Sequence, residues 1–187
     1  MNKKELLYEG KAKKVYTTED ENLYIVDYKD DATAFNGLKK GQISGKGIVN
    51  NKMSNYLMQI MEKHGIPTHF VEEISDRETV VKKVKIIPLE VIVRNIAAGS
   101  FSKRLGVEEG SPLKTTILEY CYKDDALGDP LINDYHAMAL GIATREDLDT
   151  IADLTFRVNE VLKAYFAGIN IELVDFNIEF GRTPDGQ

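Results

Sequence analysis

One stretch of the chain, Pro88–Ser100, constrains the fold more than any other. Hydrophobic and polar side chains alternate along it, as they do in a β-strand whose two faces have different surroundings. The polar face carries Glu90 and Arg94, four residues apart with Ile92 between them. A purely structural strand does not need such a pair in an apolar run. The apolar face consists of Leu89, Val91 and Val93, and Asn95 continues it.

The strand ends in small residues, Ala97–Ser100, which can leave backbone N–H groups open to a ligand. One interpretation is functional: Arg94 binds an anion together with Gly99 and Ser100. Glu90 would then lie beside that anion. The other interpretation is structural: Glu90 and Arg94 form a surface ion pair on an edge strand, and a plain turn follows. The pattern alone leaves both interpretations open.

The composition is that of a folded protein, since 43% of the 187 residues are hydrophobic and 29% are charged. This length gives one large domain or two small lobes with a real core. The net charge of −6 disfavours nucleic acid as a partner, but not small anions near local lysines. No apolar run is long enough for a signal peptide or a membrane span, so we expect a cytoplasmic protein without a membrane partner. The single cysteine, Cys121, lies in an apolar strand pattern and is predicted to be a buried thiol.

Hydrophobic spacing predicts two long helices. The first spans 48–63, and the second begins at a capping box, Thr144–Asp147, runs to about Ala167 and ends at Gly168. Shorter helices are predicted at 100–105, with Ser100 as N-cap, and at 133–140. The predicted buried stripes are Val49, Met53, Tyr56, Leu57, Ile60 and Met61 in the first long helix, and Leu148, Ile151, Leu154, Val158, Val161, Leu162 and Tyr165 in the second.

The remaining elements are strands, of which the first three form a β-meander. The last strand places Asp175, Asn177 and Glu179 on one face, where two carboxylates could share a divalent cation. Mg²⁺ with ATP is the natural candidate, and a half-exposed polar face is the alternative. The predicted strands are 6–9, 14–17, 23–28, 68–73, 79–85, 89–96, 114–122 and 169–180.

Two turns carry charged residues. The turn Gly10–Lys13 bears Lys11 and Lys13, and its backbone amides and ammonium groups could cover a polyphosphate. A solvated basic turn explains the same pattern. Asp129 precedes Pro130, so its backbone is predicted to be extended. A glycine-rich stretch at 40–47 has one residue too few between its glycines for a Walker A loop, and that interpretation is rejected.

Three of these stretches together resemble a known family. The segments Tyr8–Lys14, Pro88–Ser100 and Leu173–Gly181 are similar to signatures of SAICAR synthetase (phosphoribosylaminoimidazole-succinocarboxamide synthase), an enzyme of purine biosynthesis. The resemblance implies an α+β fold of two lobes, 1–86 with an antiparallel sheet and 87–187 with a sheet and helices. It implies a nucleotide in the cleft between them, as in kinase-like and ATP-grasp-like folds.

The resemblance also implies a reaction. ATP activates the carboxylate of CAIR (carboxyaminoimidazole ribonucleotide), and the amine of L-aspartate attacks to give SAICAR, ADP and phosphate. The implied cofactors are ATP and Mg²⁺, and a homodimer is left open. The implied site consists of Glu90, Asp129 and Asp175 for catalysis, Gly10, Lys11, Ala12, Lys13, Lys82 and Val84 for the nucleotide, Arg94, Gly99, Ser100, Lys123 and Asn177 for the substrate, and Glu179 for the metal.

The sequence departs from the family in two places. The family has lysine where this chain has Asn177, which removes a positive charge beside anionic ligands. Family members also continue for several dozen residues beyond the turn at 182–187, so we expect a fragment or a replaced C-terminal part. These departures leave a catalytically impaired nucleotide-binding fragment as an alternative. A kinase-like phosphotransferase is a second alternative, although no His-Arg-Asp catalytic loop is present.

Overall fold

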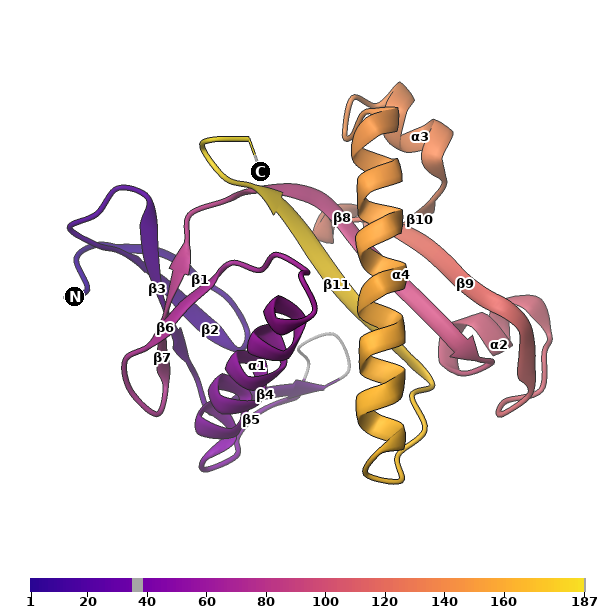
Figure 1. Cartoon of the computed structure of the whole chain (residues 1–187), viewed down its shortest axis with the longest axis horizontal. Coiled ribbons are helices and arrows are strands. Elements are labelled where there is room, and N and C mark those ends of the chain that lie inside the picture. The colour runs from indigo at the N-terminus through magenta and orange to yellow at the C-terminus, as the bar shows by residue number, and fades with distance from the viewer. Residues whose placement is uncertain (35–38, 187) are drawn as a thin grey trace. The chain divides into compact units, whose positions relative to one another are not determined.

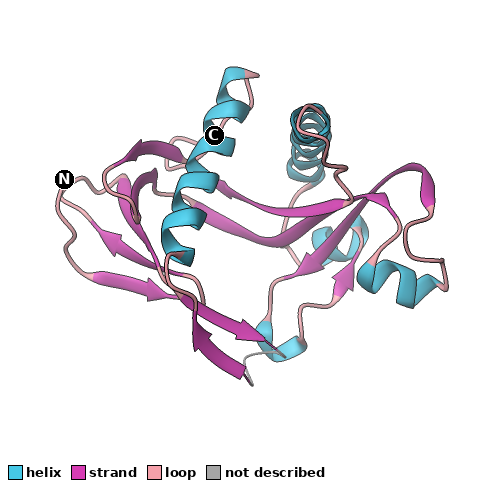
Figure 2. Cartoon of the chain, turned by 90° about the horizontal axis from the view of Figure 1, so that it is seen from below, coloured by secondary structure: helices cyan, strands magenta, loops and turns pink. Residues whose placement is uncertain are grey.

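The structure is a computed structural model that describes residues 1–34 and 39–186. The chain divides into two compact units, Met1–Lys85 with the last residues from Thr183, and Ile86–Arg182. The described part of the first unit combines the helix α1 (Lys46–Lys63) with antiparallel strands, and the second unit combines several helices with an antiparallel sheet, so the fold is α+β as predicted (Figures 1 and 2). Among the described residues, no helix has the length and apolar character needed to cross a membrane.

The first unit is built on a five-stranded sheet in the order β1-β2-β3-β7-β6. The predicted meander is confirmed as β1, β2 and β3, which pair antiparallel in sequence order. A small hairpin, β4–β5, was not predicted. The elements are β1 (Leu6–Glu9), β2 (Lys13–Thr17), β3 (Leu23–Tyr28), β4 (Asp31–Ala34), β5 (Lys39–Gln42), α1 (Lys46–Lys63), β6 (Phe70–Glu73) and β7 (Glu78–Lys82).

Helix α1 forms where predicted, but it buries a different face. Val49 and Met53 of the predicted stripe are 57% and 58% exposed, whereas Asn51 and Asn55 are buried. The Thr79 hydroxyl donates to Asn51 Oδ1 at 2.6 Å and accepts from Asn55 Nδ2 at 2.7 Å. Because these amides find hydrogen-bond partners on β7, their burial carries little penalty. The predicted apolar stripe of α1 is therefore wrong at these positions.

The second unit is built on a four-stranded sheet in the order β10-β9-β8-β11. The long strand β8 contains the predicted 89–96 and lies between β9 and β11. The last strand is shorter than the predicted 169–180, because it begins at Asp175. The elements are β8 (Lys85–Ile96), α2 (Gly99–Leu105), β9 (Pro112–Tyr122), a 3₁₀ helix (Asp125–Leu127), β10 (Leu131–Ile132), α3 (Asp134–Ala139), α4 (Arg145–Ala167) and β11 (Asp175–Arg182).

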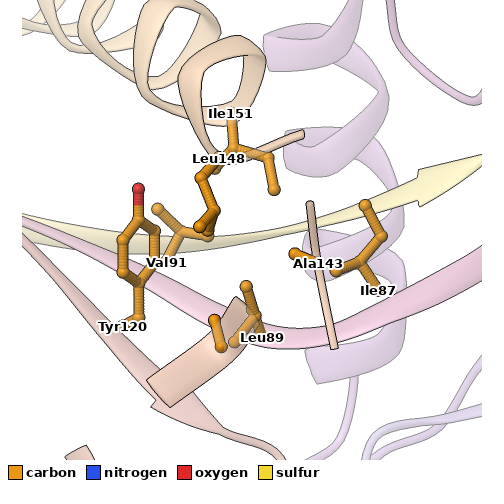
Figure 3. Close-up of a cluster of buried hydrophobic side chains, with 8 residues drawn as sticks. Ile87, Leu89, Val91, Tyr120, Ala143, Leu148 and Ile151 are labelled. Atoms are coloured by element: carbon orange, nitrogen blue, oxygen red, sulfur yellow. The ribbon is translucent and has the colours of Figure 1, made fainter. Parts of the chain in front are cut away.

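Helix α4 covers the apolar face of this sheet (Figure 1). Leu148 and Ile151 of the helix join Leu89 and Val91 of β8 in one core cluster with Tyr120 of β9 (Figure 3). Farther along the same face, Asn95 and Asn159 exchange amide hydrogen bonds of 2.8 and 3.0 Å. Helix α4 therefore packs on one face of β8 and does not cover the opposite face.

The boundaries of α4 follow from its sequence. The Thr144 hydroxyl accepts from the Asp147 amide at 3.2 Å, and Asp147 Oδ2 accepts from the Thr144 amide at 2.7 Å, which confirms the capping box. Gly168 is the C-cap, but its φ of −63° is right-handed. The left-handed residue after this helix is Asn170, with φ 59°. The end of the helix was predicted correctly, although not by the glycine conformation that such ends usually use.

Candidate functional site

The sheet of the second unit has a polar face opposite its core. Residues alternate between the two faces, so β8, β9 and β11 each contribute every second side chain to this side. We call this surface the polar sheet face. It consists of Glu90 and Arg94 from β8, Glu119 and Cys121 from β9, Lys123 directly after β9, and Asp175, Asn177 and Glu179 from β11.

Arg94 is the most strongly held residue of the polar sheet face. Its Nε donates to Glu119 Oε2 at 2.8 Å, its Nη1 to Asp175 Oδ2 at 3.2 Å and its Nη2 to Ser100 Oγ at 3.0 Å. The residue is only 5% exposed, and its guanidinium lies 6.0 Å from the centre of the Phe101 ring. A buried guanidinium is tolerated because each of its edges has a partner. The interpretation as a surface ion pair on an edge strand is therefore wrong.

Glu90 and Arg94 share a face but do not pair. Four residues of strand separate their Cα atoms by about 13 Å. Glu90 instead accepts a hydrogen bond from the Asn177 side-chain amide on the neighbouring strand β11. The two functional candidates of β8 thus belong to two separate contacts along the same sheet face.

The small residues after β8 differ in part from the prediction. Ser100 contributes its hydroxyl to Arg94, but the N-cap of α2 is Ala98, so Ser100 is not the cap. The Gly99 amide donates to Glu109 Oε1 at 2.7 Å. A carboxylate of the protein therefore occupies the Gly99 N–H group that was predicted to be open to a ligand.

Lys123 and Glu179 form the other end of the polar sheet face. The Lys123 ammonium lies 2.7 Å from Glu179 Oε1. Its hydrogen bond to Glu179 raises the pKa of Lys123, and the negative charges of Glu179, Glu90 and Asp129 raise it further. Three carboxylates thus act on one ammonium group, which keeps it charged.

Asp129 corrects one prediction about the backbone. Its φ is +49°, in the left-handed region, and not extended as expected before proline. Its carboxylate accepts from the Asp124 amide at 2.9 Å, and its own amide donates to the Asp124 carbonyl at 3.2 Å. Aspartate tolerates this conformation better than most residues, and these bonds close the loop around it.

The two acidic residues of β11 cannot share one cation. Asp175 and Glu179 are four residues apart on a continuous strand, which separates their Cα atoms by about 13 Å. Asp175 contacts Arg94, and Glu179 contacts Lys123. Across residues 1–34 and 39–186, no three His, Cys, Asp or Glu side chains gather closely enough to hold a metal ion. Glu179 alone still suits Mg²⁺, which commonly takes one or two carboxylates together with substrate phosphates.

Cys121 lies on the polar sheet face, where it is half-buried and not fully buried as predicted. Its direct partner in the β8–β9 register is Glu90. Burial raises the pKa of the thiol, and the charges of Glu90, Glu119 and Asp129 raise it further. The thiol therefore stays protonated and is a poor nucleophile.

In the first unit, the predicted lysine turn joins β1 to β2. The turn is closed by a 2.9 Å hydrogen bond from the Gly10 amide to the Lys13 carbonyl. Lys11 and Lys13 are exposed, and neither has an ion-pair partner among the described residues. Ala12 is anchored by its carbonyl, which accepts from the Lys29 amide at 2.8 Å. The turn thus holds two unpaired ammonium groups on a fixed backbone.

Lys82 ends β7, and Val84 lies in the short connection from β7 to β8. The Lys82 amide donates to the His69 carbonyl at 2.7 Å, and its ammonium donates to the Thr68 carbonyl at 3.1 Å. Burial, together with the positive charges of Lys13 and Lys82, lowers the pKa of His69 to about 4. His69 is therefore neutral near pH 7.

The glycine-rich stretch before α1 is not a phosphate loop. The Asp30 carboxylate accepts from the Gly47 amide at 2.8 Å and from the Gly45 amide at 3.3 Å. Arg77 donates to both oxygens of Asp30 at 2.8 Å, and its hydrogen bonds hold the pKa of Asp30 well below its usual range. A carboxylate of the chain thus takes the amides that a phosphate loop would offer, which supports the rejection of a Walker A motif.

Sequence reasoning missed Glu119 and Arg104. Arg104 of α2 donates to Glu119 Oε1, so one carboxylate holds two arginines. The available signal was a lone carboxylate in the apolar run Ile117–Tyr122, the same kind of signal that drew attention to Glu90 in β8.

Comparisons with known proteins agree with this architecture. The family model described as SAICAR synthetase matches residues 6–187. A phosphoribosylaminoimidazole-succinocarboxamide synthase from Lachnoclostridium phytofermentans is 64% identical over 185 residues, which are 99% of this chain and 79% of that protein. The crystal structure of the Ehrlichia chaffeensis synthase has a TM-score of 0.94 at 42% identity, covering 98% of this chain and 77% of that one. A SAICAR synthetase in complex with ADP has a TM-score of 0.92 at 46% identity, covering 96% and 76%.

The fold, the charged sheet face and these similarities define an ATP-dependent ligase. More particularly, the chain belongs to the SAICAR synthetase family, which acts in purine biosynthesis.

Proposed function

We propose that this chain joins L-aspartate to the carboxylate of CAIR and produces SAICAR, ADP and phosphate. An oxygen of the CAIR carboxylate attacks the γ-phosphorus of ATP, and ADP leaves. The amine of aspartate then attacks the acyl phosphate carbon, phosphate leaves, and the amine gives up a proton. All three substrates are anions, so the main task of the protein is to neutralise and align them.

The observation that carries the proposal is the Arg94 contact set. Arg94 is 5% exposed, and its guanidinium is hydrogen bonded to Glu119, Asp175 and Ser100. Because these contacts already orient the guanidinium, it would lose little conformational freedom when an anion binds. We assign Arg94, Gly99 and Ser100 to the ribonucleotide. For Gly99, this assignment requires that the ligand replace Glu109 on its amide.

We assign the nucleotide to the first unit. The phosphates of ATP would bind to the turn formed by Gly10, Lys11, Ala12 and Lys13. This turn offers two ammonium groups that have no ion-pair partners among the described residues. Lys82 and Val84 would lie near the adenine. The relative solved with ADP supports a nucleotide ligand in this family.

The remaining assigned residues would act on the reacting groups. Glu90, Asp129 and Asp175 are assigned to catalysis, and Lys123 and Asn177 to substrate binding. Glu179 would hold Mg²⁺, which neutralises phosphate charge when bound. The Lys123 ammonium now lies 2.7 Å from Glu179 Oε1, and Mg²⁺ would have to replace it there. We also propose that the protein works in the cytoplasm.

The test is ADP release in the presence of ATP and Mg²⁺, with CAIR and aspartate added singly and together. The proposal expects release only with both, and mass spectrometry should show SAICAR. The matched variant Arg94→Lys keeps the charge but loses the three-sided contact set, so its activity should fall at least tenfold. Release with CAIR alone would indicate a kinase-like phosphotransferase and contradict the proposal.

A second candidate is a nucleotide binder without turnover. It is favoured by Asn177, whose amide contacts Glu90 where the family has a lysine. This candidate predicts that the chain binds ADP, but that no combination of substrates leads to the formation of ADP from ATP. The same assay therefore separates the two functions.

A further inference from the structure

Glu119 is a largely buried carboxylate that the proposed reaction does not use. Its side chain is 11% exposed, and it accepts from Arg94 through one oxygen and from Arg104 through the other. It lies opposite Ile92 in the β8–β9 register, and so on the same face as Arg94. Glu119 therefore joins a strand arginine and a helix arginine through a single carboxylate.

The two carboxylates on Arg94 differ in how firmly they are held. Glu119 contacts Nε at 2.8 Å, whereas Asp175 contacts Nη1 at 3.2 Å and is 40% exposed. A carboxylate near solvent at the longer distance is easier to replace with a ligand anion, because it regains its hydration. If Glu119 moved away, the Nε group of Arg94 would stay buried without a hydrogen-bond acceptor, which is costly. Glu119 is thus the carboxylate that Arg94 would keep if an anion displaced Asp175.

We propose that Glu119 is a positioning residue that presents Arg94 and Arg104 together to the phosphate monoester of the ribonucleotide. This inference rests on the proposed function. The carboxylate orients Arg94 through Nε, so a phosphate that displaces Asp175 from Nη1 would meet both Nη groups beside the Ser100 hydroxyl. It also holds Arg104, whose side chain is 37% exposed, next to the same position.

Simple electrostatics predicts the opposite effect of removing this charge. Without Glu119 the polar sheet face becomes more positive, so a charge effect alone would strengthen anion binding. Positioning predicts weaker binding, because both arginines lose their orientation. Whether the affinity for the anion rises or falls when Glu119 is replaced therefore distinguishes a charge effect from positioning.

The experiment compares Glu119→Gln, Glu119→Asp and the control Asp134→Asn by calorimetric titration of CAIR and, separately, of ADP. Asp134 forms a 2.7 Å ion pair with Arg145 between α3 and α4, outside the polar sheet face. We expect Glu119→Gln to raise the Kd for CAIR about tenfold and to leave the Kd for ADP within about twofold. Glu119→Asp should recover part of the loss, and Asp134→Asn should bind CAIR as the wild type does.

Unchanged or tighter CAIR binding by folded Glu119→Gln would overturn the inference. An equal loss of ADP and CAIR binding would also overturn it, because that is the result of a general structural defect. Ribose 5-phosphate, titrated by NMR, tests whether the phosphate monoester is the group recognised. A wild type that binds CAIR and ribose 5-phosphate but never releases ADP would overturn the reaction and leave the positioning test valid. A wild type that binds neither would overturn both proposals.

Discussion

At the scale of single residues, most charged side chains of the polar sheet face are paired with a group of opposite charge. Arg94 has Glu119, Asp175 and Ser100, and Lys123 has Glu179. Glu90 differs, because its hydrogen-bond donor is the neutral amide of Asn177. An amide satisfies one oxygen of the carboxylate but does not neutralise its charge. A carboxylate without full compensation opposes the approach of anionic substrates.

This contact leads to a prediction for Asn177→Lys. An ammonium group at this position would neutralise Glu90 and add a positive charge to the polar sheet face, so the rate of ADP release should rise, by about fivefold or more. The measurement is kcat and KM for CAIR, with ATP and aspartate saturating.

Asn177→Gln is the matched control, because it lengthens the side chain without adding charge, and it should not raise the rate. An unchanged or lower rate in Asn177→Lys would argue against a role for charge at this position.

At the scale of elements, β8 and α1 show two outcomes of hydrophobic patterning. The alternation in β8 predicted its buried face correctly, since Leu89, Val91 and Val93 are at most 1% exposed. The spacing in α1 did not, because a hydrogen-bonded amide network replaced apolar contacts. Asn51 Nδ2 donates to the Ser75 and Asp76 carbonyls, both at 3.1 Å, and so fastens the helix to the turn before β7.

The network predicts an unusual order of mutational effects in α1. Asn51→Leu, which the spacing alone would favour, should lower the free energy of unfolding by about 2–4 kcal/mol. The Ser75 and Asp76 carbonyls lose the Asn51 amide donor, and the Thr79 hydroxyl keeps only Asn55. Met53→Ala should change it by less than about 0.5 kcal/mol, because Met53 is 58% exposed. Urea unfolding measures both variants. The account of α1 is wrong if Met53→Ala proves the more destabilising change.

At the scale of the whole molecule, the proposed ligands divide between the two compact units. The residues assigned to the nucleotide lie in Met1–Lys85, and those assigned to the ribonucleotide lie in Ile86–Arg182. A nucleotide site shared by the two units stays a prediction, as do the lobe boundaries 1–86 and 87–187.

Hydrogen exchange can test this division. ADP added without Mg²⁺ should slow amide exchange in the turn at 10–13 and in the connection at 82–84, and CAIR should slow exchange at 94–100. Helix α3 (Asp134–Ala139), which carries no assigned residue, serves as the internal control. Protection by ADP that appears only within the second unit would contradict the assignment of the nucleotide to the first.

Local sequence was enough to predict the antiparallel meander, the strand through Arg94, helix α4 with its capping box, and the charged face of β11. Each of these depends on side-chain periodicity or on a contact within a few residues. The motifs at 8–14, 88–100 and 173–181 were also enough to recognise the family.

Only the tertiary structure decided the partners. Asp175 lies 81 positions from Arg94 in sequence, and Asn177 lies 87 positions from Glu90, so no local pattern could pair them. The same holds for Glu119, for the buried amides of α1 and for the left-handed backbone of Asp129. Periodicity tells which face of an element a side chain occupies, but only the packing of distant elements determines which group it meets there.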